Sequence, residues 1–373
     1  MTTPSTPSIR STEWPAIRTH GSERIRAAGV AGAGGAGFPS YAKWQDLETV
    51  DSLLVNHQES EPNYVADKWL GDTHAAAFAT LFETLLEQAF DLIVVSAKWI
   101  DRTEYLQELE AETGGTVIPP GELPLDREAE SGVVFAYTDD EYQYGMESVL
   151  LNVVDGTVIG DDLPTDHGWL VQNTETMYNI YRALSEGVPV TRTYVHVSGD
   201  VPRDRFLEVP VGTPANDLLN AAGLSAEALP SETVLADGGP GWCFPIDTSP
   251  AEYGVTKSTN GLLALDERTV DGSELGTGRL DVRDEYEWDR RTVPPEPTEI
   301  EPTSVRIPLI TNPEYDVVEP GVPSVSVGDR VERGERIANP SPDGISIPHH
   351  ASIDGTVSAV TETVIEIESP SSG

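Results

Sequence analysis

Cysteine and basic residues are both scarce in this sequence. Cys243 is the single cysteine among 373 residues, so the chain forms no internal disulfide and cannot hold an iron–sulfur cluster with four thiolates of its own. Lysine and arginine together number 23, and four of these are lysine, against 63 aspartate and glutamate residues, for a formal net charge of −40. Such a chain repels a phosphate backbone over most of its surface, which argues against nucleic acid as a partner.

The acidic residues are spread through segments that also carry periodic apolar residues, which indicates folded domains with acidic faces rather than a disordered tail. We interpret this acidity as an adaptation to a very salty cytoplasm. At about 1 M salt the Debye length is ~3 Å, so repulsion between carboxylates is screened while they keep the surface hydrated. The chain is therefore predicted to be a halophilic protein of the haloarchaeal type.

Long apolar runs are absent as well. No run approaches the roughly 18 residues that a membrane span needs. Residues 1–18 begin with a stretch rich in Ser, Thr and Pro and have no apolar core, so we expect a flexible N-terminal tail rather than a signal peptide. These features predict a cytoplasmic protein with no direct membrane span. Any contact with the inner face of the membrane would run through partner subunits.

Strand-like and helix-like segments alternate in the first half of the chain. The apolar runs 53–56, 91–97 and 132–138 have the length of buried strands, while 72–90 and 103–115 carry apolar residues at helical spacing. Strands that alternate with helices indicate an α/β domain with a largely parallel sheet. The whole chain is longer than one hydrophobic core usually serves, so a multidomain protein is expected.

Composition divides the chain into five parts. After the α/β region comes compact α+β material, then an acidic segment that ends in "VPPEPTEIEP" and has the composition of a linker. Strand-like runs broken by glycine turns follow, which indicates an all-β end. The expected parts are the tail (1–18), an α/β domain (19–189), a small α+β domain (190–265), an acidic proline-rich linker (266–302) and an all-β domain (303–370).

The glycine-rich stretch "GVAGAGGAGFPSYAKW" raises the question of nucleotide binding. Gly32, Gly34 and Gly37 fit the spacing G-x-G-x-x-G, but a Rossmann phosphate loop needs a strand before it and a helix after it. The preceding residues are helix-like, and a proline two residues after the last glycine would interrupt a helix. A flexible turn is the simplest alternative. Lys43 favours an anion site, because glycine amides and a lysine charge can hold an anion together.

A polar cluster follows the first predicted strand. The stretch "NHQESEPNYVAD" places Asn56, Gln58, Glu59 and Glu61 at or just beyond the end of that strand. In α/β sheets ligands bind outside the carboxyl ends of the strands, so these groups are candidates for a binding site. A plain polar loop in an acid-rich protein is the alternative that these residues alone leave open.

These two stretches and several later ones resemble a known family. "GAGGAGFPSYAKW" and "VNHQESEPNYVAD" are followed in order by "YQYGMESVL", "HGWLVQNTETMYNIYRAL", "VHVSGDV" and "GGPGWCFPIDTSPAEYGVTKSTNGLLAL". Together they look like the flavin-binding fold shared by the NADH-oxidising subunit of respiratory complex I, the RnfC subunit of the ferredoxin:NAD oxidoreductase and cobalamin reductases of the PduS kind. The likeness covers nearly the whole chain.

The resemblance implies a fold for each part. It implies an FMN- and NADH-binding α/β domain at 19–189, and a β-grasp domain of the soluble-ligand-binding (SLBB-like) type with a family motif at 190–265. It also implies an RnfC-like barrel-sandwich hybrid domain, akin to lipoyl carriers, at 303–370. The glycine stretch would then be a phosphate and flavin loop rather than a Rossmann turn. No lysine follows Lys257, so we expect the last domain to be structural or a docking surface and not a covalent carrier.

The resemblance also implies roles for individual residues. Glu61 and Glu147 match positions near the nicotinamide, which they would orient, and Phe38 matches the aromatic position that stacks on the adenine of NADH. The other matches to cofactor-binding positions are Gly32, Gly34, Gly35 and Gly37, whose backbone N–H groups would line the cofactor; Lys43, Asn56, Gln58 and Glu59 at the flavin or ribityl; Tyr142 and Gly145 near flavin and nicotinamide; and Asn173 and Thr174 at the flavin phosphate.

The chain departs from the family pattern in two ways. Gln58 stands where complex I subunits have aspartate and Met146 where relatives have glycine or glutamate, and both changes are expected to act on NADH binding more than on FMN binding. His57 is also unusual there, and is expected to be a surface or supporting group rather than a catalyst. Relatives carry four or more cysteines for iron–sulfur clusters where this chain has the acidic linker, so electrons would leave the flavin for a separate protein.

No metal site is predicted. The adjacent His349 and His350 fall in a strand-like run, where neighbouring side chains point to opposite faces and do not share one ion. The leading hypothesis is an FMN-dependent electron-transfer subunit, an NADH dehydrogenase-like oxidoreductase. It would oxidise NADH and pass electrons to a separate acceptor protein or a membrane electron-transport complex. The alternative is a non-catalytic docking or assembly subunit that kept the fold and lost the clusters.

Overall fold

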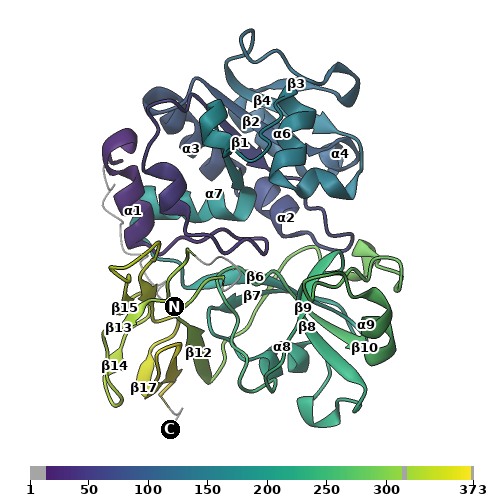
Figure 1. Cartoon of the computed structure of the whole chain (residues 1–373), viewed down its shortest axis with the longest axis vertical. Coiled ribbons are helices and arrows are strands. Elements are labelled where there is room, and N and C mark those ends of the chain that lie inside the picture. Colours follow the sequence, from purple (N-terminus) through teal and green to yellow (C-terminus); the bar gives the residue numbers. More distant parts are fainter. Residues whose placement is uncertain (1–13, 313–316, 371–373) are drawn as a thin grey trace, which may run out of the picture.

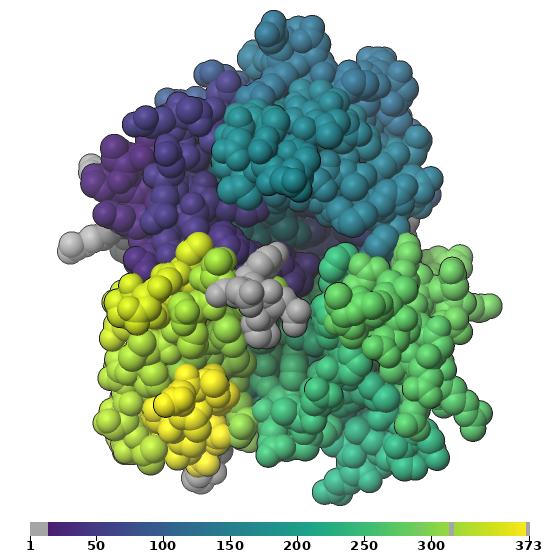
Figure 2. Space-filling model, in the orientation of Figure 1, coloured from purple at the N-terminus to yellow at the C-terminus, as the bar shows by residue number. Residues whose placement is uncertain are grey.

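The computed structural model describes residues 14–312 and 317–370, which form three bodies in contact (Figure 1). The first body, purple to teal, lies above the other two, which are green and yellow. In the space-filling view the first body rests on both lower bodies, so its lower edge meets parts of the chain that are distant in sequence (Figure 2). Among the described helices, none combines the length and the apolar character that a membrane crossing requires.

A parallel sheet of five strands lies at the centre of the first body. The strand order is β3-β4-β2-β1-β5, and each adjacent pair is parallel. The predicted α/β class is confirmed, and the runs predicted as strands at 53–56, 91–97 and 132–138 correspond to β1, β2 and β4. The strands are β1 (Ser52–Asn56), β2 (Leu92–Lys98), β3 (Thr116–Ile118), β4 (Gly132–Thr138) and β5 (Trp169–Asn173).

Helices cover both faces of this sheet, because its strands are apolar on both sides. Phe78, Phe82 and Leu85 of α3 pack on one face, and Leu150 and Val154 of α6 pack on the other. The helices are η1 (Ile17–Gly21), α1 (Ser22–Ala27), η2 (Ser40–Trp44), α2 (Ala66–Thr73), α3 (Ala75–Gln88), η3 (Trp99–Asp101), α4 (Arg102–Tyr105), α5 (Gln107–Thr113), η4 (Pro120–Glu122), η5 (Tyr142–Gly145), α6 (Glu147–Asp155), η6 (Pro164–His167), α7 (Thr174–Tyr181) and η7 (Arg182–Glu186).

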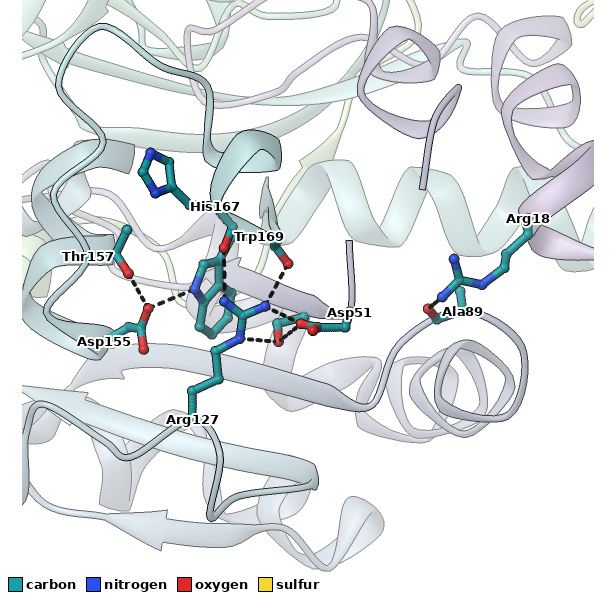
Figure 3. Close-up of polar contacts among 10 residues, drawn as sticks. Arg18, Asp51, Ala89, Arg127, Asp155, Thr157, His167 and Trp169 are labelled. Carbon is teal, nitrogen blue, oxygen red and sulfur yellow. Dashed lines mark hydrogen bonds and ion pairs between the residues drawn. The ribbon is translucent and has the colours of Figure 1, made fainter. Parts of the chain in front are cut away.

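The amino-terminal end of the sheet is closed by a polar network centred on Arg127 (Figure 3). The guanidinium of Arg127 lies over the Trp169 ring at 4.9 Å from its centroid, and the indole N–H donates to Asp155 Oδ2 at 2.8 Å. These groups satisfy one another, so the opposite end of the sheet is the one left for a ligand. The acceptors of Arg127 are Ser52 Oγ at 3.0 Å, His167 O at 2.9 Å, Gly168 O at 3.1 Å and the carboxylate of Asp51.

The second body has a mixed sheet with a β-grasp arrangement. Strands β6 and β7 form an antiparallel hairpin, α8 covers one face, and β10 returns parallel to β6, which gives the order β11-β7-β6-β10-β8-β9. The elements are β6 (Arg192–Gly199), β7 (Arg205–Pro210), α8 (Ala215–Ala221), η8 (Ala226–Ala228), β8 (Thr233–Gly239), β9 (Trp242–Pro245), β10 (Gly261–Asp266), α9 (Glu267–Ser273), η9 (Arg290–Thr292) and β11 (Thr298–Glu299).

The segment 266–302, expected to be a linker, packs against this second body instead. Leu280 and Val282 are fully buried beside Cys243 on the face of the sheet opposite α8, and β11 extends the sheet by pairing with β7. The acidic, proline-rich composition conceals two apolar residues at alternate positions, which is enough to fix the segment to a sheet face. This part of the chain is therefore a packed extension of the β-grasp sheet.

The third body is the expected all-β domain. Two small antiparallel sheets, β12-β18-β17-β14 and β13-β15-β16, enclose an aliphatic core that includes Ile307, Ile337 and Ile365. The strands are β12 (Ser304–Pro308), β13 (Val322–Pro323), β14 (Arg330–Val331), β15 (Arg336–Asn339), β16 (His349–His350), β17 (Gly355–Val360) and β18 (Val364–Glu368).

The predicted N-terminal tail ends earlier than expected. Its residues 1–13 lie outside the described part of the chain. Ile17 is buried in the first core, and the Trp14 ring packs on Tyr181 with ring centroids 6.1 Å apart. These two apolar residues, three positions apart, attach residues 14–18 to the α/β body.

Candidate functional site

Two asparagines mark the carboxyl ends of the central strands. Asn56 ends β1 and lies opposite Asn173, which ends β5. The Asn56 amide donates to Gly145 O at 2.8 Å, and the Thr174 hydroxyl donates to Asn56 O at 3.2 Å. Asn173 caps α7 by accepting from the Thr176 amide at 3.2 Å. Four predicted site residues, Asn56, Gly145, Asn173 and Thr174, therefore meet at one sheet edge.

The glycine loop, residues 31–39, closes on itself above this edge. Ala31 and Pro39 form an antiparallel bridge, the Gly32 amide donates to Phe38 O at 2.8 Å, and the Gly37 amide donates to Gly32 O at 2.7 Å. The Gly35 amide donates to Ser258 O at 2.9 Å. This corrects the expectation that all four glycines offer their amides to a ligand: those of Gly32, Gly35 and Gly37 hold the loop together.

The tip of the glycine loop has the character of an anion seat. In the described part of the chain, the amides of Gly34 and Ala36 have no hydrogen-bond acceptor. Gly34 and Gly35 are exposed with positive φ, and a Cβ at Gly35 would meet nothing within 4 Å. A Cβ at Gly34 would lie 3.3 Å from Asn173 Nδ2, so the loop tip faces the start of α7. Free amides beside an amide side chain fit the phosphate of a flavin mononucleotide.

Lys43 supplies the positive charge of the site. It lies on η2, directly after the loop, and its ammonium pairs with the Glu147 carboxylate at 2.7 Å. The same ammonium donates to Val171 O at 3.3 Å, two residues before Asn173 on β5. Both side chains of the pair are about one third exposed, at 31% and 37%. The predicted residues Lys43 and Glu147 are thus adjacent, at the same edge as the asparagines.

Glu61 lies in a second cluster, at the boundary with the β-grasp body. Its carboxylate accepts from the Tyr142 hydroxyl at 2.8 Å and from the Gly241 amide at 2.8 Å. Burial raises the pKa of Glu61 to about 7, against the opposing effect of these two donors. A Cβ at Gly239 would meet Glu61 Cδ at 2.3 Å, and one at Gly241 would meet the Tyr142 ring at 2.4 Å. Close packing around Glu61 therefore requires both glycines of the motif "GGPG".

A cleft of about 620 Å³ opens beside Glu61 and Tyr142. One wall comes from the α/β body, including Lys98, which pairs with Asp140 at 2.7 Å. The other wall comes from the segment once expected to be a linker, where the Arg283 guanidinium lies 3.9 Å from the centroid of the Tyr142 ring. The lining residues are Glu59, Ser60, Glu61, Pro62, Lys68, Lys98, Ile100, Asp101, Asp140, Tyr142, Arg283, Tyr286, Trp288 and Asp289.

A group of buried acids lies behind the asparagine pair. Glu59 Oε2 accepts from the Asp67 amide at 2.6 Å, while Asp67 accepts from Asn173 Nδ2 at 2.8 Å and from the Glu175 amide at 3.2 Å. Burial raises the pKa of each of the three carboxyl groups, for Glu175 to about 8. The predicted residue Glu59 therefore supports the Asn173 end of the site through Asp67.

Replacing Glu175 by glutamine should stabilise the protein at alkaline pH. Glu175 accepts from the Thr193 hydroxyl at 3.0 Å, and glutamine can keep that acceptor. Because burial raises the folded-state pKa from 4.5 to about 8, the folded protein keeps a proton that the unfolded chain has released between these values. The free energy of unfolding of the wild type thus falls as pH rises through this window.

The measurement for Glu175→Gln is urea unfolding at pH 5, 7 and 8.5 in concentrated KCl. The free energy of unfolding of the variant, relative to wild type, should increase with pH, by a few kcal/mol at pH 8.5. Glu83→Gln, on an exposed position of α3, is the matched control. A difference between Glu175→Gln and wild type that stays constant across the three pH values would contradict the burial argument.

Three residues singled out from the sequence do not face this space as expected. The Gln58 side chain is fully buried between Ser96 and Thr138, which hold its amide at 3.1 and 3.2 Å, so it turns into the sheet edge. His57 is buried rather than on the surface, and its Nδ1 lies 2.8 Å from the Thr174 hydroxyl. Phe38 is partly buried at the base of the glycine loop. Within residues 14–312 and 317–370, no set of three or more His, Cys, Asp or Glu side chains is arranged to hold a metal ion.

Several residues around the site were not predicted from the sequence. They are polar side chains that support the predicted ones from other elements, and none belongs to a recognisable spacing. Asp67 follows the polar stretch after β1 and had a signal there, whereas the others become neighbours of the site only through the fold. They are Asp67, Glu175, Thr176, Ser258, Arg283, Thr311 and Asn312.

Comparison with known proteins places two parts of the chain in families. A family described as the Nuo51 FMN-binding domain matches residues 25–182, which include the glycine loop, β1 and β5. A family described as the RnfC barrel sandwich hybrid domain matches residues 296–372. An NAD⁺-reducing [NiFe]-hydrogenase in the H₂-reduced state shares the fold, with a TM-score of 0.54 and 20% identity over 72% of this chain and 50% of that one.

Two relatives show how the chain matches whole proteins. It is 31% identical to the cobalamin reductase PduS of Citrobacter freundii over 264 residues, which are 66% of this chain and 53% of that protein. In the ion-translocating oxidoreductase complex of Pseudomonas aeruginosa, it is 32% identical to the component designated C over 250 residues, 65% of this chain and 30% of that protein. The chain thus spans about half the length of the first relative and less of the second. It belongs to the RnfC, PduS and complex I flavoprotein subunit family, and carries the FMN-binding and barrel-sandwich domains of that family.

Proposed function

We propose that this chain binds FMN at the edge formed by the glycine loop, Lys43, Asn56 and Asn173, oxidises NADH there and passes the electrons to a separate acceptor protein. One observation carries the proposal: the free amides of Gly34 and Ala36 face the start of α7 at the carboxyl end of the sheet. An anion at the loop tip would gain two hydrogen bonds without displacing a bond within the protein. The Lys43 ammonium would add charge on the same edge.

The chain's own residues would position the reactants. Flavin, when bound, accepts a hydride from nicotinamide, and the protein supplies orientation and electric field. Glu61, held by Tyr142 and Gly241, would orient the nicotinamide from the cleft, while Glu147 balances the Lys43 charge. With a pKa near 7, the Glu61 carboxyl can either accept or donate a hydrogen bond at neutral pH. The relatives named as a reductase and as part of an oxidoreductase complex support this class of reaction and a partner protein as acceptor.

The proposal is tested by reconstitution with FMN in concentrated KCl. The purified protein should become yellow, and NADH added under anaerobic conditions should bleach the flavin absorbance. A preparation that binds FMN but is not bleached by NADH would remove the NADH part. A colourless preparation that never takes up FMN would favour the docking or assembly subunit instead.

A charge variant sharpens this test. Lys43→Gln should weaken FMN binding about tenfold, because a charge-assisted contact contributes on the order of 1.5 kcal/mol. Arg182→Gln is the matched control, since the Arg182–Glu186 pair is exposed to 31% and 34%, close to the values for Lys43 and Glu147. The dissociation constants follow from quenching of FMN fluorescence. Equal binding by both variants would remove Lys43 from the flavin site.

A further inference from the structure

The glycine loop is held by three parts of the chain that are distant in sequence. On the α/β side, the Ala33 amide donates to the Thr176 hydroxyl of α7 at 2.9 Å. From the β-grasp body, Ser258 O accepts the Gly35 amide at 2.9 Å. From the third body, Asn312 Nδ2 donates to Ala36 O at 2.7 Å. The loop tip therefore has its shape fixed at consecutive residues by different domains.

Thr311 makes the closest of these contacts. It follows β12 in the third body, is 4% exposed, and its hydroxyl donates to Gly37 O at 2.5 Å. Gly37 is buried against it: a Cβ there would meet Thr311 O at 2.5 Å. The Thr311 carbonyl accepts in turn from the Ser258 hydroxyl at 3.0 Å, so both supporting domains are tied together beneath the loop.

The base of the loop is anchored by the same pair of domains. Lys257, next to Ser258, is 4% exposed and donates to Gly29 O at 2.7 Å and to Pro348 O at 3.3 Å. Gly29 lies just before the loop and Pro348 precedes β16 of the third body. One buried ammonium thus joins the start of the loop to the third body, while Thr311 and Asn312 join its end.

We propose that the third body acts as a clamp on the glycine loop, with Thr311 as a positioning residue that sets the Gly34 and Ala36 amides for a flavin phosphate. The inference rests on the proposed FMN site and adds a role for the barrel-sandwich domain. The hydroxyl of Thr311 and the amide of Asn312 fix the carbonyls of Gly37 and Ala36, which lie just beyond the free Ala36 amide. The loop tip is otherwise made of exposed, glycine-rich chain, which has no side chains to hold it.

The test is the affinity of Thr311→Val for FMN compared with riboflavin, which lacks the phosphate. The variant keeps the shape of the side chain and removes the hydrogen bond to a buried carbonyl, so FMN should bind about tenfold more weakly. Riboflavin binding should be unchanged. Thr311→Ser, which keeps the hydroxyl, should restore FMN affinity. Both constants come from quenching of flavin fluorescence in concentrated KCl.

Thr361→Val is the matched control in the same domain. Its hydroxyl bonds only within the turn before β18, at 3.1 Å from Val364 O, away from the loop, so it should leave FMN affinity unchanged. Equal FMN affinity of Thr311→Val and wild type, or an equal loss for FMN and riboflavin, would overturn the clamp alone. A wild type that binds no FMN would instead overturn the proposed function, and the clamp with it.

Discussion

Alanine at position 37 should lower FMN affinity about 100-fold or more. Gly37 has a φ of +65°, where alanine is strained by about 1 to 2 kcal/mol. Its Cβ would also lie 2.5 Å from both Thr311 O and Asn312 Cβ, and overpacking of this kind typically costs about 1 to 3 kcal/mol. The backbone oxygen cannot rotate away, so the loop itself must move. The Gly34 and Ala36 amides would move with it and leave the phosphate seat.

The control for Gly37→Ala is Gly160→Ala. Gly160 has a similar φ of +59°, and a Cβ there would meet nothing within 4 Å. This variant carries the same backbone strain far from the loop, so FMN affinity should not change. Fluorescence titration gives the affinities, and thermal unfolding of the FMN-free proteins shows whether Gly37→Ala remains folded. Unaltered FMN binding by folded Gly37→Ala would show that the loop geometry does not determine the site.

Transfer from concentrated salt to dilute buffer should unfold the protein. The net charge of −40 means that at least 40 acidic side chains have no basic residue to pair with. Their mutual repulsion is screened when the Debye length is about 3 Å, at 1 M salt, and extends over about 10 Å at 0.1 M. We expect the melting temperature to fall by about 15 °C or more between these conditions, equivalent to several kcal/mol.

Circular dichroism melts across a KCl series measure this effect. NaCl at equal ionic strength should stabilise the fold similarly, because screening depends on charge and concentration. Sucrose does not screen charge, so it should restore less of the lost stability than salt does. A melting temperature that does not fall as salt is removed would contradict the halophilic interpretation.

The sheet was predictable where apolar runs were long and uninterrupted. Leu92–Lys98 and Gly132–Thr138 are largely buried and read as continuous strands. Trp169–Asn173 escaped prediction because its five residues end in Gln172 and Asn173, so only three apolar residues marked it. The predicted helix at 72–90 proved to be parts of two helices, Ala66–Thr73 and Ala75–Gln88, which meet at His74 without a proline or glycine to show the break.

The candidate site was predictable where it depends on strand ends. The position of Asn56 followed from the buried run before it, and the structure brings Asn173 beside it through parallel pairing. Ser258 and Thr311 could not be predicted, since a single hydroxyl has no periodicity and their contacts cross more than 200 residues of sequence. Gln58 turned inward because the strand end has buried hydroxyls of its own, at Ser96 and Thr138, that need a partner.

All four lysines of this chain are engaged in contacts near the site or the loop. The side chains of Lys68 and Lys98 are 4% and 9% exposed in ion pairs, and Lys257 is buried beneath the loop, while that of Lys43 is 31% exposed. Apart from the α-amino group, the acidic surface therefore offers acylating reagents almost no amine except the one at the proposed flavin seat. Amine acylation, a surface label for most proteins, would in this chain act as an affinity-like probe of a single locus, and a ligand seated there would shield it.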